Sequence, residues 1–150
     1  GNMIEYADIN QYLESNDYSS SSELTCDIIY QKLFTDNPYI YKIDKNDYIS
    51  SKYYKGVVFL VSKKDKTEYD FHFYRKDTNN IWSHKYGIEK VTNEYQIPRT
   101  LLKILNKTKY IDDPELDMYF TSDKKGDTCK VCSYLAIPKN NNIKFMKYIR

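Results

Sequence analysis

Three residues of this chain have the side-chain types of a thiol hydrolase: Cys26, His72 and His84. Such an enzyme needs a cysteine nucleophile, a histidine that takes up its proton and a third polar group that orients the histidine. Cys26 lies near the start of an expected helix, where backbone N–H groups and the helix dipole favour the thiolate. The chain has only these two histidines. We therefore take Cys26 as the candidate nucleophile, His72 as the general base and acid, and His84 as the orienting group.

The two histidines fall in neighbouring expected strands, joined by a polar turn at residues 77–80. If this turn has an odd number of residues centred on Thr78, position n pairs with position 156 − n and His72 faces His84 directly. The same register places Tyr74 opposite Trp82, where both would line the substrate cleft. A turn of two or four residues would instead put the histidines on opposite faces of the sheet.

Other elements must position this hairpin. A Ser-Ser-Ser-Glu run at residues 20–23 fits a capping box, and apolar residues recur at helical spacing after it. Helices that precede a mostly antiparallel sheet make an α+β fold. We expect one domain, 1–150, with Gly1-Asn2 as a tag remnant before Met3 and residues 140–150 as a tail. The expected elements are helices at 4–14, 20–34 and 98–107, strands at 56–62, 69–76, 81–86 and 131–137, and an added edge strand at 143–148.

Composition argues against several classes of protein. The net charge is +2, whereas a dedicated nucleic-acid binder carries a strong basic excess. Mixed lysine and tyrosine runs such as residues 52–55 could stack on single-stranded nucleic acid, but an AT-rich coding bias explains them better. The longest apolar run, residues 57–61, is too short to cross a bilayer. We expect no nucleic-acid or membrane partner.

The cysteines bear on compartment and metal binding. Three cysteines without a signal-peptide pattern predict free thiols in a reducing compartment, and hence a cytoplasmic protein. Cys129 and Cys132 form a single Cys-x-x-Cys pair, and a zinc site that combines them with His72 and His84 is conceivable. In a strand, however, the two cysteine side chains would project to opposite faces. We therefore predict no metal and no cofactor.

The order and spacing of Cys26, His72 and His84 resemble the NlpC-type branch of the papain-like cysteine peptidases. In that branch the cysteine heads a helix that packs on an antiparallel sheet, and the histidine and the third polar residue lie on successive strands. The likeness covers roughly residues 20–90, although this chain has Thr25-Cys26-Asp27 where those enzymes often have Asp-Cys-Ser. It implies a papain-like arrangement that hydrolyses an amide or related acyl bond in a peptide or peptide-like substrate.

Two motifs, His72-Phe73-Tyr74-Arg75 and Trp82-Ser83-His84-Lys85, lie in a longer part of the chain that carries a second resemblance. This part is similar to a family of uncharacterised proteins from large DNA viruses and some low-GC bacteria. Lys76 and Tyr86 depart from its pattern, which has Gln and Pro there. This resemblance supports a role for the histidine pair without naming a reaction. It leaves open two alternatives to a hydrolase: a catalytically inactive relative that acts as a protein-binding module, and a host-directed interaction protein of viral origin. The similar segments are 36–38, 69–77, 82–85 with Gly87, 91–93, and 131–134 with Pro138.

Overall fold

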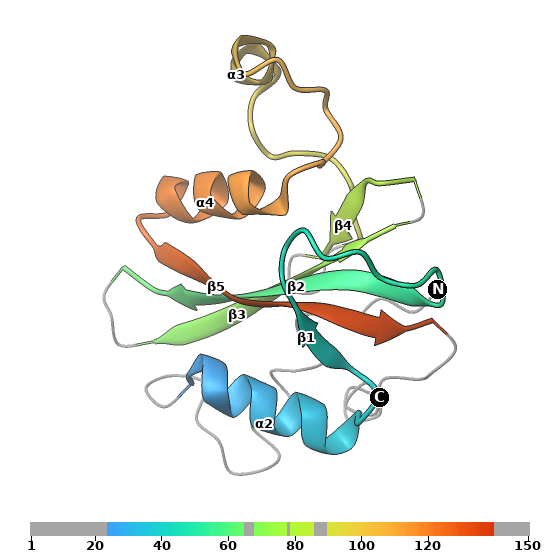
Figure 1. Ribbon diagram of the computed structural model, residues 1–150. Helices are drawn as coiled ribbons and strands as arrows, with labels where there is room; N and C mark the ends of the chain where they lie inside the picture. The colour runs from blue at the N-terminus through green and yellow to red at the C-terminus, as the bar shows by residue number, and fades with distance from the viewer. Residues whose placement is uncertain (1–23, 65–67, 78, 86–89, 140–150) are drawn as a thin grey trace.

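The computed structural model describes residues 24–64, 68–77, 79–85 and 90–139, which form an α+β fold around an antiparallel five-stranded sheet (Figure 1). The strand order is β1-β5-β2-β3-β4, so the last strand returns between the first two. The strands are β1 (Tyr41–Ile43), β2 (Tyr53–Ser62), β3 (Tyr69–Lys76), β4 (Trp82–His84) and β5 (Thr128–Pro138). The helices are α2 (Cys26–Asp36), α3 (Arg99–Ile104) and α4 (Pro114–Lys124).

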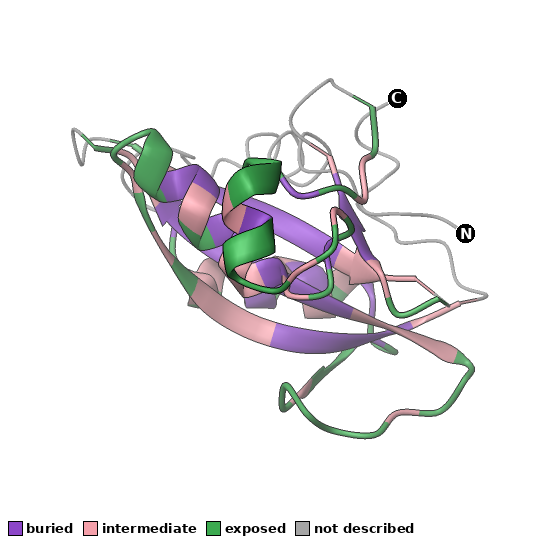
Figure 2. Cartoon of the chain, turned by 90° about the horizontal axis from the view of Figure 1, so that it is seen from above, coloured by how far each residue is buried: buried purple, intermediate pink, exposed green. Residues whose placement is uncertain are grey.

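The two faces of the sheet carry separate apolar clusters, because successive strand residues point to opposite sides. Helix α2 covers one face and helix α4 the other (Figure 1). In β3, Phe71 and Phe73 pack on the α2 face, whereas Tyr74 packs on the α4 face. His72, between the two phenylalanines, therefore points toward α4. Buried residues gather in the central strands, which are covered on both sides (Figure 2).

Most of the expected strands are confirmed. The strand expected at 56–62 is β2, the one at 69–76 is β3, and the one at 131–137 is β5, each within three residues at either end. The helix expected from residue 20 begins instead at Cys26, because the Thr25 side chain accepts the hydrogen bond of the Ile28 N–H (3.2 Å). The expected helix at 4–14 and strand at 143–148 lie outside the described residues.

Two elements were missed by the sequence analysis, β1 and α4. The sequence analysis assigned no element between residues 107 and 131, but Asp113-Pro114 begins a helix there. The Asp113 carboxylate accepts hydrogen bonds from the N–H groups of Glu115 (3.1 Å) and Leu116 (3.3 Å), and proline at the first helical position lacks only an N–H that the helix does not use. No helix in the described part of the chain is long and apolar enough to cross a membrane.

Candidate functional site

The two histidines contact each other on the α4 face of the sheet, at the junction of β3 and β4. His72 Nε2 lies 2.7 Å from His84 Nδ1. At this distance one nitrogen carries the hydrogen and the other accepts it, so the contact holds a single proton. His84 is fully buried and His72 is 5% exposed. The expected pairing of the histidines on one face is confirmed.

The register of the hairpin differs from the expected one. Tyr74 pairs with His84 and Lys76 pairs with Trp82, so position n pairs with 158 − n and not with 156 − n. The turn is centred one residue later: the Asp77 N–H donates to the Ile81 carbonyl (2.8 Å), and Asn80 takes a left-handed φ of 66°. A shift of two residues in the pairing keeps every side chain on its expected face. The histidines are therefore diagonal neighbours and do not face each other directly.

A buried carboxylate, Asp117 of α4, is the third member of this cluster. Its Oδ2 atom accepts a hydrogen bond from the Tyr74 hydroxyl (2.6 Å) and lies 3.5 Å from His84 Nε2. Its Oδ1 atom accepts from the Gln96 N–H (3.1 Å). The sequence analysis missed Asp117 because it did not predict α4. The signal was present: Asp117 is three residues after Pro114 and four before Thr121, the spacing of one helix face.

Burial determines the protonation of the histidines. It lowers the pKa of His72 to about 3, and the positive charges of Lys125 and Lys63 act in the same direction. Burial and the neighbouring His72 lower the pKa of His84 to about 2. Both rings are therefore neutral at physiological pH. A general base is most effective when its pKa lies near the working pH, so His72 is a weak base in this setting.

Cys26 is not brought together with the histidines. It is the first residue of α2 and forms a disulfide with Cys132 of β5, with a Cα–Cα distance of 5.4 Å. Both cysteines pack against the cluster on the α2 face, whereas His72 and His84 lie on the α4 face. The strands of the sheet separate the sulfur atom from the imidazole rings. The prediction of free thiols is wrong for these two cysteines.

Cys129 remains a thiol, half-buried against the cluster on the α4 face. Burial raises the pKa of this thiol, which favours the unreactive protonated form. Cys129 and Cys132 project to opposite faces, as the sequence predicted. The conceivable zinc site does not form, and no group of three or more histidine, cysteine or acidic residues among those described is arranged to hold a metal ion.

The two expected substrate-binding residues have different surroundings. The Tyr74 ring is fully buried and stacks on the His84 ring, with centroids 4.2 Å apart. It belongs to the buried polar cluster. Trp82 packs edge-on against Tyr134 and borders a cavity of about 320 Å³. Trp82 is thus the one of the pair that could contact a ligand.

Comparison with known proteins adds no identification. No family model matches the sequence, and curated proteins and solved structures give no significant match. The function must therefore be argued from the geometry of the chain itself.

Proposed function

We propose that this protein is a binding module in which the histidine pair stabilises the core, and not a thiol hydrolase. The observation that carries the proposal is the position of Cys26, tied by a disulfide to Cys132 on the face of the sheet opposite His72 and His84. A cysteine–histidine dyad requires the two side chains within hydrogen-bond reach on one side of the fold. Reduction of the disulfide would free the Cys26 thiol without carrying it through the sheet.

The polar cluster has a structural role in this proposal. Buried side chains connect α4, β4 and β3 through polar contacts. Tyr74 donates to Asp117 (2.6 Å), Asp117 lies 3.5 Å from His84, and His84 lies 2.7 Å from His72. Asp117 also receives the Gln96 N–H, which fixes the segment that leads from β4 to α3. A buried polar network of this kind favours one arrangement of the elements.

Exposed aromatic side chains support a binding role. Tyr39, Tyr41 and Tyr48 are exposed on β1 and its flanking segments, and Tyr48 is 99% exposed. Tyrosine combines a large apolar area with a hydrogen-bonding hydroxyl and is enriched at binding surfaces. β1 is also an edge strand of the sheet. Exposed tyrosines therefore lie on this edge strand and on the segments next to it.

A papain-like thiol hydrolase is the competing hypothesis. The order of Cys26, His72 and His84 in the sequence supports this hypothesis. The α+β fold, with a cysteine at the start of a helix, also supports it. It requires the thiol and the imidazole on the same face, which the register of β3 opposes. The similarity to uncharacterised viral and bacterial proteins is compatible with either hypothesis, because it names no reaction.

Thiol labelling followed by mass analysis tests the proposal. The oxidised protein should take up at most one iodoacetamide, at Cys129. After mild reduction Cys26 should react no faster than an ordinary thiol, and at the same rate in the His72→Gln variant, because no imidazole activates it. Cys129→Ser is the matched control, since it removes a thiol on the other face. Rapid labelling of Cys26 that is lost in His72→Gln, or peptide hydrolysis that is lost in Cys26→Ser, would refute the binding-module proposal.

A further inference from the structure

Two lysines, Lys55 of β2 and Lys76 of β3, lie near the ends of these strands on the face of the sheet that carries the histidines. On the α4 face, β3 presents His72, Tyr74 and then Lys76, which is half-buried. The β2–β3 register ends with the pair of Gly56 and Arg75, and its extension by one residue would set Lys55 opposite Lys76. Besides burial, the charge of Lys76 lowers the pKa of Lys55, so the two ammonium groups lie near each other. Like charges directly opposite each other destabilise an antiparallel pair. This arrangement therefore needs a reason beyond the stability of the sheet.

Neither ammonium group has a carboxylate partner in the part of the chain that the structure describes. Lys55 Nζ donates to the backbone carbonyls of Lys45 (3.0 Å) and Asp47 (2.9 Å). The Lys76 ammonium group makes no ion pair or hydrogen bond within the described residues. Burial and the charge of Lys76 lower the pKa of Lys55, and the nearby Asp47 only partly offsets this effect. The two lysines thus form a positive centre that no ion pair among the described residues neutralises, although Asp47 supplies an opposing charge nearby.

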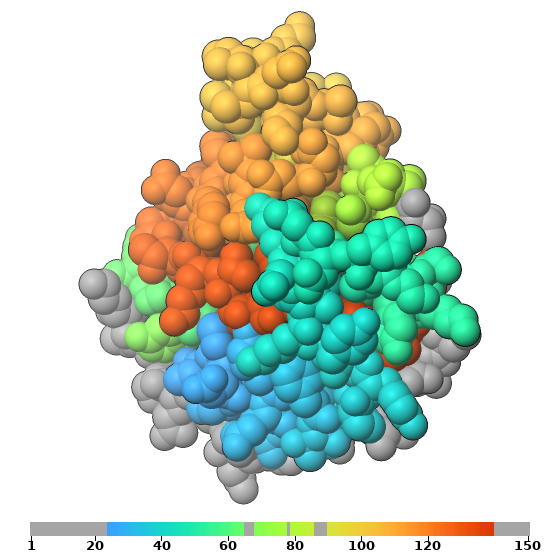
Figure 3. All heavy atoms as spheres, viewed as in Figure 1, coloured from blue at the N-terminus to red at the C-terminus, as the bar shows by residue number. Residues whose placement is uncertain are grey.

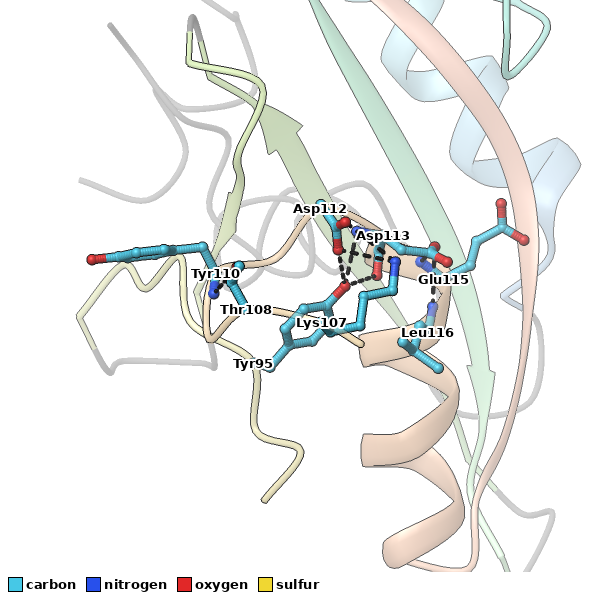
Figure 4. Close-up of polar contacts among 8 residues, drawn as sticks. All are labelled: Tyr95, Lys107, Thr108, Tyr110, Asp112, Asp113, Glu115 and Leu116. Carbon is cyan, nitrogen blue, oxygen red and sulfur yellow. Dashed lines mark hydrogen bonds and ion pairs between the residues drawn. The ribbon is translucent and has the colours of Figure 1, made fainter. Parts of the chain in front are cut away.

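The acidic and basic groups around this centre already have partners. Arg75 pairs with Asp77 (3.1 Å), and the Asp47 carboxylate accepts the Asp44 N–H (2.8 Å). Figure 4 shows the same pattern at the N-terminus of α4, where Lys107 pairs with Asp112 (3.2 Å). Of the two acidic groups, Asp77 pairs with a cation, whereas Asp47 accepts a backbone N–H and acts electrostatically on Lys55.

Lys55 and Lys76 line two cavities at once. The larger, about 380 Å³, is also bordered by Tyr48, Tyr54, Ser50 and Lys139. The smaller, about 320 Å³, lies between the sheet and the start of α4. The connection between β1 and β2 packs against α4 next to it (Figure 3), held by the pair between Lys45 and Glu115 (3.0 Å). Both volumes lie in the range of small-ligand sites.

We propose that Lys55 and Lys76 bind the phosphate group of a small organic phosphate, whose remaining part occupies the larger cavity beside Tyr48. The proposal rests on the binding role argued above and names its ligand class. Lys76 offers all its N–H donors and Lys55 offers the one that its carbonyl contacts leave. Lysine ammonium groups bind phosphate as point charges. A long polyanion fits less well, because Asp47 and Asp77 border the larger cavity.

Calorimetric titration with ADP, pyrophosphate and inorganic phosphate tests this site. We expect ADP and pyrophosphate to bind the wild-type protein, and Lys76→Gln to raise Kd about tenfold or more, by loss of one charge-assisted contact. Lys76→Gln should keep the melting temperature of the wild type or raise it, because it relieves the repulsion with Lys55. Lys103→Gln is the matched control: it removes an exposed lysine on α3 and should leave Kd nearly unchanged.

Two results would overturn the site. One is the absence of heat with all three probes at roughly 10 mM, well above the dissociation constants of specific ligands. The other is equal weakening by Lys76→Gln and Lys103→Gln, which would indicate diffuse attraction of anions. Either result leaves the outcome of thiol labelling unaffected, so failure of this site and failure of the binding-module proposal are distinguishable.

Discussion

The buried histidine pair should make the stability of this protein depend on pH in a defined direction. In the folded chain the pKa of His72 is about 3 and that of His84 about 2, because burial disfavours the charged rings. In the unfolded chain both return to about 6.5. Between pH 6.5 and pH 3 the unfolded state therefore binds more protons. The free energy of unfolding is then unaffected by these groups above pH 6.5 and falls as the pH drops below it.

The size of the effect follows from the difference between the pKa of each histidine in the folded chain and its pKa in the unfolded chain. At pH 5 protonation of one histidine in the unfolded chain lowers the free energy of unfolding by about 2 kcal/mol, from RT ln(1 + 10^1.5). The two histidines together lower it by about 4 kcal/mol. This is a large part of the roughly 5–15 kcal/mol that stabilises a typical domain. The folded state cannot offset the loss by protonating both rings, because the 2.7 Å contact has room for one proton.

Urea unfolding at pH 8, 6 and 5 measures this dependence, with the fluorescence of Trp82 as the signal, since it is the single tryptophan and is buried. The His72→Gln variant is the control: one titrating group is removed, so the loss between pH 8 and pH 5 should shrink by about 2 kcal/mol. Carboxylates contribute equally to the pH dependence of both proteins, so their contribution cancels when the two are compared. Identical pH dependence in the two proteins, or an NMR titration that gives either histidine a pKa near 6.5 in the folded state, would refute the reasoning.

Three further substitutions test the packing. Asp117→Ala leaves the Tyr74 hydroxyl and the Gln96 N–H without their acceptor and should lower the free energy of unfolding in urea by about 2–6 kcal/mol. A decrease below about 1 kcal/mol would contradict the network. Replacing Cys26 and Cys132 with serine opens a cross-link that spans 106 residues and should cost about 2–5 kcal/mol, whereas no change would show that the disulfide is absent in solution. Gly56→Ala places a Cβ atom 2.6 Å from the Phe73 ring and should lower the free energy of unfolding by about 1–3 kcal/mol by the same measurement; unchanged stability would show that the ring can move.

Most strands could be predicted from the sequence because the pattern of apolar residues that identifies a strand lies within the strand itself. β2 is a continuous apolar run, and β3 carries apolar residues on both of its faces. That His72 and His84 share a face was expected only for a turn with an odd number of residues. The exact register was not readable, because it depends on the turn. The Asn79 side chain accepts the Ile81 N–H (3.1 Å) and Asn80 adopts a left-handed backbone, and together they shift the pairing by two residues.

The errors come from contacts between distant parts of the chain. The disulfide joins Cys26 to Cys132, and no local pattern marks two of three cysteines as partners at that separation. Cys132 lies at an irregularity of β5, where Val58 pairs with Ser133 but Phe59 pairs with Val131. Such a bulge changes which way a side chain points, so face assignments from simple alternation lose their basis beyond it.

The alternation of β3 also connects the two proposals. Its odd residues, Phe71 and Phe73, face α2 and the disulfide, so a histidine between them can contact only the α4 side. Its even residues pass in one row from the buried His72 through Tyr74 to Lys76 at the edge of the cavities. The face that carries the imidazole rings, opposite the disulfide, is therefore also the face that carries the positive centre of Lys55 and Lys76. A thiol hydrolase needs its thiol and its imidazole on one face of the sheet. The row of side chains that β3 presents beside the imidazole ends instead in the Lys76 ammonium group near that of Lys55, which suits the proposed binding of an anion.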